Sequence, residues 1–172
     1  MLKLRPYRQE DAGKIVSWCR DEAEFYRWTG GSLGPWPLSE EQWTCFTARK
    51  CADSLYFPFT AFDEKGPAGF FSLLCLQEDP GDLRFCYVII DPARRGQGCA
   101  KEMLRMGLLF AFRLYGANKV SLKVFENNAS ALSCYRALGF KERGPAADKE
   151  FPVFSAKLLT MECPAPEKEA FL

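Results

Sequence analysis

The chain has 172 residues, 48% of them apolar, which is enough for one hydrophobic core and predicts a single domain. Its 23 basic and 22 acidic side chains nearly cancel, so the overall charge does not indicate nucleic acid or an anionic membrane as a partner. The chain has no histidine, which excludes Ser-His and Cys-His relays, and its eight cysteines show no Cys-x-x-Cys spacing, which argues against a structural zinc site.

The N-terminal part of the chain predicts a strand followed by two helices. Residues 2–7 alternate apolar and basic side chains as a half-buried strand does, and residues 15–19 place apolar side chains at helical spacing. Turn-forming residues concentrate in 30–37. A second helix is expected over 39–50, because Ser39 is a favourable residue at a helix start.

The middle of the chain predicts three consecutive strands and a long helix. Apolar runs cover 57–62, 68–76 and 83–90, and the segments between them are rich in Gly, Pro and acidic residues that form tight turns. The helix is expected over 98–115, where apolar residues form one stripe.

The C-terminal part predicts a strand over 119–125, a helix over 128–138 and a final strand over 153–161. We expect a single domain of residues 1–162 and a flexible tail of residues 163–172. The order of elements predicts an α/β (α+β) fold, a mixed sheet with helices on its faces.

The sequence shows no segment that predicts membrane insertion or export. It has no apolar signal segment at its start and no run of about 18 apolar residues. We therefore expect a cytoplasmic protein with reduced thiols.

The segment 89–100 has the chemistry of a site for a diphosphate. Gly96 and Gly98 lack the Cβ atoms that would block a close approach, and the helix start that follows offers unpaired N–H donors. Basic side chains add positive charge: Arg94, Arg95 and Lys101. A Walker A loop is excluded because no Gly-Lys-Ser/Thr string occurs, and a dinucleotide fingerprint lacks its third glycine. An ordinary glycine-rich helix start is the alternative.

Two motifs resemble those of the Gcn5-related N-acetyltransferases. The first reads Arg95-Gly96-Gln97-Gly98-Cys99-Ala100 and is similar to the family's loop around the coenzyme A diphosphate. The second reads Asn128-x-x-Ala131-x-x-x-Tyr135-x-x-x-Gly139-Phe140 and is similar to the helix beside the thiol end of the coenzyme. The resemblance extends over residues 2–161 and implies a mixed, mostly antiparallel sheet of six to seven strands with helices on both faces.

The resemblance also implies the reaction and its partners. Acetyl-CoA would be the co-substrate, without a metal, and a primary amine of a small molecule or a peptide would attack its thioester directly. The protein would be a monomer or a homodimer. A catalytically weak module that binds CoA for regulation or interaction is the alternative function.

The coenzyme contacts implied by the resemblance lie in both motifs and at the end of a strand. Backbone groups near Val88 would bind the pantetheine arm where two strands separate, and polarise the carbonyl. The full set is Val88, Ile89, Ile90, Arg94, Arg95, Gly96, Gln97, Gly98, Cys99, Ala100, Lys101, Asn128, Ala131 and Tyr135.

Several of these residues have two interpretations. Tyr135 is the candidate general acid for the departing thiolate, or a residue of the core. Asn128 either caps its helix or also contacts the coenzyme. Cys99 and Cys134 are either small packing residues or nucleophiles that would carry the acetyl group.

The general base is not evident from the sequence. Many relatives have a glutamate on the fourth strand, where Arg84 stands here, which puts a direct carboxylate base in doubt. Arg84 suits either an acceptor that carries an acid or a surface ion pair. Substitutes that would act through water are Glu24, Asp82 and Glu126. We expect contacts to the acceptor from residues 18–43, which include aromatic and acidic side chains.

Overall fold

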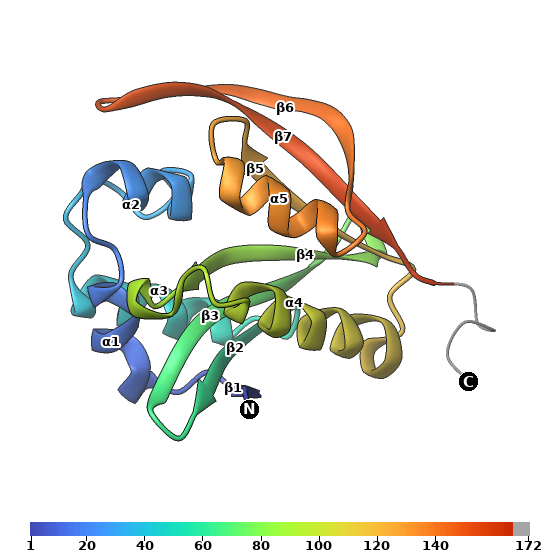
Figure 1. Cartoon of the computed structure of the whole chain (residues 1–172), viewed down its shortest axis with the longest axis horizontal. Helices are drawn as coiled ribbons and strands as arrows, with labels where there is room; N and C mark the ends of the chain where they lie inside the picture. The colour runs from blue at the N-terminus through green and yellow to red at the C-terminus, as the bar shows by residue number, and fades with distance from the viewer. Residues whose placement is uncertain (167–172) are drawn as a thin grey trace.

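The computed structural model describes residues 1–166, which form one seven-stranded sheet with helices on both faces (Figure 1). The strands are β1 (Lys3–Pro6), β2 (Tyr56–Asp63), β3 (Gly66–Leu76), β4 (Asp79–Ile90), β5 (Lys119–Phe125), β6 (Lys141–Phe151) and β7 (Phe154–Pro164). The helices are α1 (Ala12–Ser17), α2 (Glu22–Thr29), α3 (Glu40–Cys51), α4 (Cys99–Leu109) and α5 (Ala129–Ala137). Short turns of other helix types cover Gln9–Asp11, Pro92–Arg94 and Phe110–Tyr115.

The strand order is β1-β2-β3-β4-β5-β7-β6. Neighbouring strands are antiparallel except for β4 and β5, which are parallel. This topology confirms the expected mixed, mostly antiparallel sheet. The β6–β7 hairpin reaches past α5 toward α2 (Figure 1), where Phe151 of the hairpin stacks on Tyr26 with 4.6 Å between ring centroids.

Side-chain caps begin two helices where the sequence predicts them. Ser39 Oγ accepts a hydrogen bond from the Gln42 amide at 3.1 Å, and the Ser39 amide donates to the Gln42 side chain at 2.8 Å, so α3 begins with a capping box. Asn128 Oδ1 accepts from an amide in the first turn of α5 at 3.3 Å. The helix predicted over 98–115 is α-helical as far as Leu109 and ends in a π-helical turn.

Two elements are missing from the sequence prediction. Asp21 caps the start of helix α2, where its carboxylate accepts from the Glu24 amide at 2.8 Å, and Gly30, with a φ of 60°, caps its end. With eight residues, it is too short for a strong periodic pattern. Strand β6 is an edge strand with mostly exposed, polar side chains, so pairing with β7 rather than apolar alternation holds it in the sheet.

Strand β7 extends two residues into the segment predicted as a tail. The prediction assigns residues 163–172 to a tail, whereas β7 continues through this point. Cys163 is buried and pairs with Val120 of β5, because the sheet register extends to the last residues of the strand. Residues 167–172 of the predicted tail lie outside the described residues.

Alternating residues of the central strands bury two clusters, one on each face of the sheet. Phe71 and Leu122 belong to the cluster that includes Leu104 of α4. Phe70 belongs to the other cluster, which includes Trp43 of α3. Helices therefore cover both faces, as expected. Within residues 1–166, no helix is both long and apolar enough to cross a lipid bilayer.

Candidate active site

The sheet opens between its two central strands. Residues 82–85 of β4 pair with residues 119–122 of β5, and the ladder ends there. Beyond it, Tyr87 and Val88 together lie opposite Phe71 of β3, which is a β-bulge. Tyr87 has a φ of 54°, in the left-handed region that non-glycine residues rarely adopt. The bulge bends β4 away from β5 and leaves the β5-facing edge of its last residues without a strand partner.

Side chains from α2 and the loop after it hold this bulge. Trp28 Nε1 donates a hydrogen bond to the Tyr87 carbonyl at 2.9 Å, and the Tyr87 hydroxyl lies 3.1 Å from Ser32 Oγ. These contacts offset a backbone strain on the order of 1–2 kcal/mol. Sequence reasoning missed Tyr87 because a bulge arises from the pairing of two strands and leaves no local signal in either.

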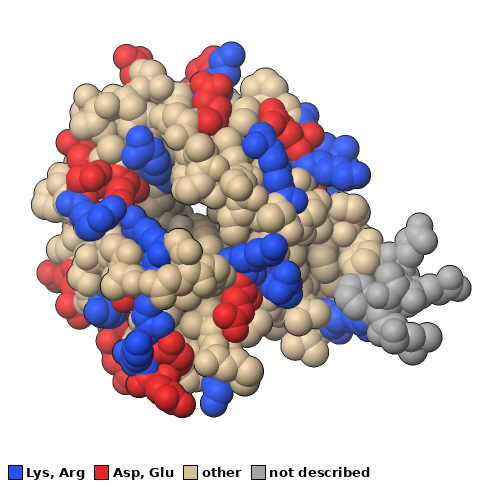
Figure 2. Space-filling view, in the orientation of Figure 1, with Lys and Arg blue, Asp and Glu red and all other residues tan. Residues whose placement is uncertain are grey.

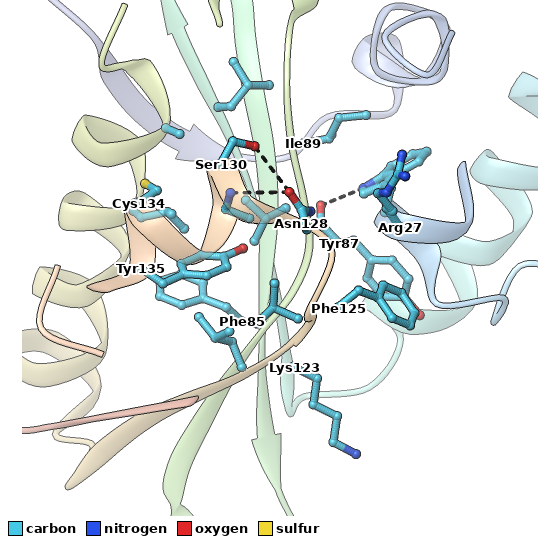
Figure 3. A pocket seen from close by; sticks show the side chains of 18 of the residues that line it. Arg27, Phe85, Tyr87, Ile89, Lys123, Phe125, Asn128, Ser130, Cys134 and Tyr135 are labelled. Atoms are coloured by element: carbon cyan, nitrogen blue, oxygen red, sulfur yellow. Dashed lines mark hydrogen bonds between the residues drawn. The ribbon is translucent and has the colours of Figure 1, made fainter. Parts of the chain in front are cut away.

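A cavity of about 1070 Å³ occupies the opening between β4 and β5. Its walls come from α2, β4, the loop before α4, β5, α5 and the β6–β7 hairpin. Figure 2 shows a hollow in the molecule with basic side chains near it, and Figure 3 shows side chains from α5 and α2 on opposite sides. All of the predicted coenzyme contacts except Gln97 line this cleft. The Gln97 side chain instead donates to the Ala93 carbonyl at 2.9 Å.

The loop before α4 suits an anionic group. Gly96 and Gly98 have φ angles of 74° and 81°, and no atom lies within 4 Å of the position that a Cβ would take on either. Glycine is therefore required by the backbone conformation, and the space beside the loop is open to a ligand. Within residues 1–166, the amides of residues 96–98 donate to no protein acceptor. These unpaired donors at the start of a helix fit the diphosphate of coenzyme A.

The two arginines of this loop bind carboxylates of the protein. Arg94 forms a forked pair with Asp63, with N–O distances of 2.7 and 2.9 Å, which holds the pKa of Asp63 well below its usual range. Arg95 contacts Glu24 at 2.6 Å. In the described part of the chain Lys101 has no ion pair, so it is the loop's available cation.

Tyr135 lies on α5 with its ring in the core and its hydroxyl directed into the cleft (Figure 3). Its ring meets Phe140 edge-on at 5.9 Å between centroids. Burial raises the pKa of the Tyr135 phenol well above its usual value, so the hydroxyl keeps its proton at neutral pH. The position combines both interpretations of the residue, because the ring packs while the hydroxyl is available as a donor.

The neighbouring residues of both motifs have structural roles. Asn128 and Ala131 line the cleft beside Tyr135, and Asn128 is the N-cap of α5. Cys99 and Cys134 also line it. Burial raises the pKa of the Cys134 thiol, which disfavours the nucleophilic thiolate.

Of the three carboxylates considered as a base, Glu24 alone lines the cleft. Burial favours a higher pKa for Glu24, but hydrogen bonds from Arg20 and Arg95 lower the pKa to about 2, which makes its carboxylate a weak base. Asp82 is buried and accepts from Ser121 Oγ at 2.9 Å, away from the cleft. Glu126 is exposed and accepts from a backbone amide of β7.

The sequence is similar to known acetyltransferases. The family model described as "Acetyltransferase (GNAT) domain" matches residues 1–141. Mycothiol acetyltransferase from Salinispora tropica is 31% identical over 106 residues, which cover 58% of this chain and 34% of that protein. Spermine/spermidine N(1)-acetyltransferase from Bacillus subtilis is 34% identical over 55 residues, which cover 32% of this chain and 36% of that protein. The aligned regions thus span about a third of these relatives.

The fold also has a close counterpart among solved structures. The crystal structure of spermidine N-acetyltransferase from Vibrio cholerae in complex with CoA and spermine superposes with a TM-score of 0.81. The match covers 95% of both chains at 19% identity, so it shows a shared fold.

Proposed function

Because the chain belongs to the acetyltransferase (GNAT) domain family, we propose that it transfers an acetyl group from acetyl-CoA to a primary amine. The observation that carries this proposal is the cleft between β4 and β5, which joins the glycine loop to the Tyr135 hydroxyl. One continuous space thus connects donors for a diphosphate with a proton donor for a leaving group.

Different groups of the protein bind the diphosphate, orient the pantetheine arm and donate the proton. When bound, acetyl-CoA supplies the activated acyl group as a thioester. The amides of residues 96–98 and the Lys101 side chain hold the diphosphate. The free edge of β4 over 87–90 orients the pantetheine arm by backbone hydrogen bonds, as an added strand would be held. Tyr135 holds its proton on Oη and donates it to the departing sulfur.

Proton removal from the acceptor does not depend on a strong carboxylate base. An alkyl amine has a pKa of about 10.4 and is mostly protonated at neutral pH. Glu24 is the acid in the cleft lining among the described residues, and its pKa of about 2 makes it a poor acceptor of that proton. We propose that solvent water takes the proton, so that the enzyme uses the neutral fraction of the amine.

The acceptor enters beside α2 in this proposal. The relatives are named for mycothiol, spermidine and spermine, and the solved neighbour holds spermine beside CoA. These proteins share an amine as the acceptor, and we propose a primary amine of a small molecule or a peptide for this chain. The described cleft is formed within one chain, so a monomer or a homodimer would carry complete sites.

We also propose the cytoplasm as the place of action. All eight cysteines are free thiols, three of them buried, which suits a reducing compartment.

Mass spectrometry with isotope-labelled acetyl-CoA tests the enzyme proposal. The protein is incubated with amino acids, polyamines, aminoglycosides and N-terminal peptides, and each product mixture is examined for the labelled acetyl group. We expect transfer to at least one amine. If acetyl-CoA binds and no amine is acetylated, the alternative of a regulatory module that binds CoA replaces the enzyme.

A further inference from the structure

The cleft has a second wall on the face of the sheet that carries α2, and this wall is basic. Leu122 of β5 packs into the cluster with α4, so Lys123, the next residue, points to the opposite face. Arg84 lies opposite Ser121 in the β4–β5 register and therefore shares the face of Lys123. Both cations line the cleft.

The β6–β7 hairpin adds a third cation to the same face. Phe125 of β5, Leu158 of β7 and Ala147 of β6 are cross-strand neighbours, and Phe125 follows Lys123 by two residues. Lys149 lies two residues beyond Ala147, so its side chain points to this face as well. It too lines the cleft.

Helix α2 contributes the fourth cation. Arg27 lies over the ring of Phe154, with 5.1 Å from its guanidinium carbon to the ring centroid, and it lines the cleft from the side opposite α5 (Figure 3). Arg27 thus contacts an aromatic ring, which carries no formal negative charge to neutralise the guanidinium.

The cleft lining itself holds little negative charge to oppose these cations. Glu24, the acid of the cleft lining in the described chain, is already bonded to Arg20 and Arg95. Asp82 lies outside the cleft lining but shares the face of Arg84, and Ser121 Oγ links the two side chains, because it accepts from Arg84 Nε at 3.3 Å and donates to Asp82 at 2.9 Å. Outside the glycine loop, four cations of the cleft lining form no ion pair within residues 1–166. They are Arg27, Arg84, Lys123 and Lys149.

Two of these cations, Arg84 and Lys123, act on Cys86, which shares the face of Arg84. Burial raises the pKa of the Cys86 thiol to about 11, and Arg84, Lys50 and Lys123 all act to lower it. Two cations of the wall, together with Lys50 of α3, therefore act on this one thiol. The coenzyme loop uses other donors, the amides of 96–98 and Lys101, so the basic wall exceeds what the diphosphate requires.

We infer that the acceptor is a primary amine that also carries a carboxylate, which the basic wall of Arg27, Arg84, Lys123 and Lys149 binds. This inference rests on the proposed acetyltransferase function and narrows its substrate class. In the reaction, the acetyl C–S bond breaks and a C–N bond forms, so that the products are the N-acetyl amino acid and free CoA. The ammonium form first gives one proton to solvent. After the neutral amine has attacked, its nitrogen gives a second proton to solvent while Tyr135 gives one to the sulfur, and Tyr135 regains its proton from solvent, so that one proton is released in all. Polyamines would meet like charge on this wall.

Three four-carbon amines of similar basicity test the inference. They are 4-aminobutyrate, 4-aminobutanol and 1,4-diaminobutane, which differ at the far end in carrying a carboxylate, a hydroxyl or an ammonium group. We expect kcat/KM for acetylation to be at least about tenfold higher for the carboxylate than for the hydroxyl compound, and lowest for the diamine. A diamine that reacts as well as the carboxylate compound would overturn the inference and leave the acetyltransferase proposal intact.

Variants that each remove one positive charge test whether the basic wall binds the carboxylate of the acceptor. Lys123→Gln and Lys149→Gln alter exposed side chains, so both variants should fold, and each is expected to reduce the preference for 4-aminobutyrate over 4-aminobutanol by about tenfold. Lys157→Gln is the matched control, because Lys157 lies on the same hairpin but points to the opposite face. Ala156 is the cross-strand partner of Lys149, and Lys157 follows it by one residue. An equal loss in all three variants would contradict a specific wall.

A binding measurement decides the inference even if none of these amines is acetylated. Calorimetry on the CoA-saturated protein compares glutarate with 1,5-diaminopentane, which have the same chain length and opposite charges. We expect glutarate to bind at least about tenfold more tightly and to bind more weakly to Lys123→Gln. Equal binding, tighter binding of the diamine, or no binding of glutarate would overturn the inference.

Discussion

The guanidinium of Arg95 lies 2.6 Å from the carboxylate of Glu24, and so ties the glycine loop before α4 to helix α2. The same guanidinium donates to the backbone carbonyls of Trp18 and Ile90 at 3.4 and 3.2 Å. A side chain predicted to hold the diphosphate therefore joins two walls of the cleft. This leaves backbone amides and Lys101 as the loop's free donors for the diphosphate.

The pH dependence of stability tests the tie between Arg95 and Glu24. Burial favours a higher pKa for Glu24, but hydrogen bonds lower it to about 2, so the ionised carboxylate stabilises the fold above its unfolded pKa of about 4.3. That contribution is lost as the pH falls from this value toward about 2. With allowance for solvent screening, Glu24→Gln should lower the free energy of unfolding by about 1 kcal/mol at neutral pH. Denaturant titrations should show this difference shrinking in acid, and a difference independent of pH would contradict the assignment.

Removal of the Tyr135 hydroxyl separates its two roles. Tyr135→Phe keeps the ring contact with Phe140, so we expect little change in melting temperature or in acetyl-CoA affinity. Loss of a general acid should lower kcat by about a hundredfold. Tyr115→Phe is the control, because Tyr115 lies outside the cleft lining and donates to Cys75. Unchanged turnover in Tyr135→Phe would assign the residue to the core alone.

The glycine loop can be tested without changing any charge. Gly98→Ala places a Cβ on a backbone with a φ of 81° and should reshape the loop, because this conformation costs about 1–2 kcal/mol for residues other than glycine. We expect at least about tenfold weaker binding of acetyl-CoA. Gly34→Ala is the matched control, with a φ of 86° and open space around it, outside the cleft lining. It should lower stability by a similar amount and keep the affinity, and weakened binding in both would point to general destabilisation.

The pH profile of catalysis reports on the general base. Without a carboxylate of suitable pKa in the described cleft, kcat/KM should rise about tenfold per pH unit until the acceptor amine itself titrates, near about pH 10. The raised pKa of Tyr135 keeps its proton in place over this range. Steady-state rates across pH check the slope. A plateau that begins near neutral pH with a simple alkyl amine would reveal a base that this account omits.

The sequence predicts those parts of the fold that local signals determine. Residues 119–125 form β5 as expected, since apolar Val120, Leu122 and Val124 alternate with polar side chains at the spacing of a strand. The cap at Asn128 and the glycine loop also follow from local chemistry. Helix α2 carries local cap signals at Asp21 and Gly30, whereas the polar edge strand β6 carries no local pattern that marks a strand.

The site depends on contacts between distant segments, which the sequence does not reveal. The opening of the sheet follows from the bulge at Tyr87, which Trp28 supports from 59 positions earlier in the chain. The pairing of Arg94 with Asp63 likewise joins residues 31 positions apart. The resemblance of the motif predicts that Arg94 and Arg95 bind a diphosphate. Only the folded structure shows that carboxylates of the protein already bind both side chains.

Titration calorimetry of acetyl-CoA and CoA into the protein shows whether the cleft between β4 and β5 is a coenzyme site. We predict saturable binding of both molecules at one site per chain, and weaker binding to Gly98→Ala than to Gly34→Ala. If neither molecule binds to the folded protein, the cleft between β4 and β5 is not a coenzyme site and the proposed function is wrong.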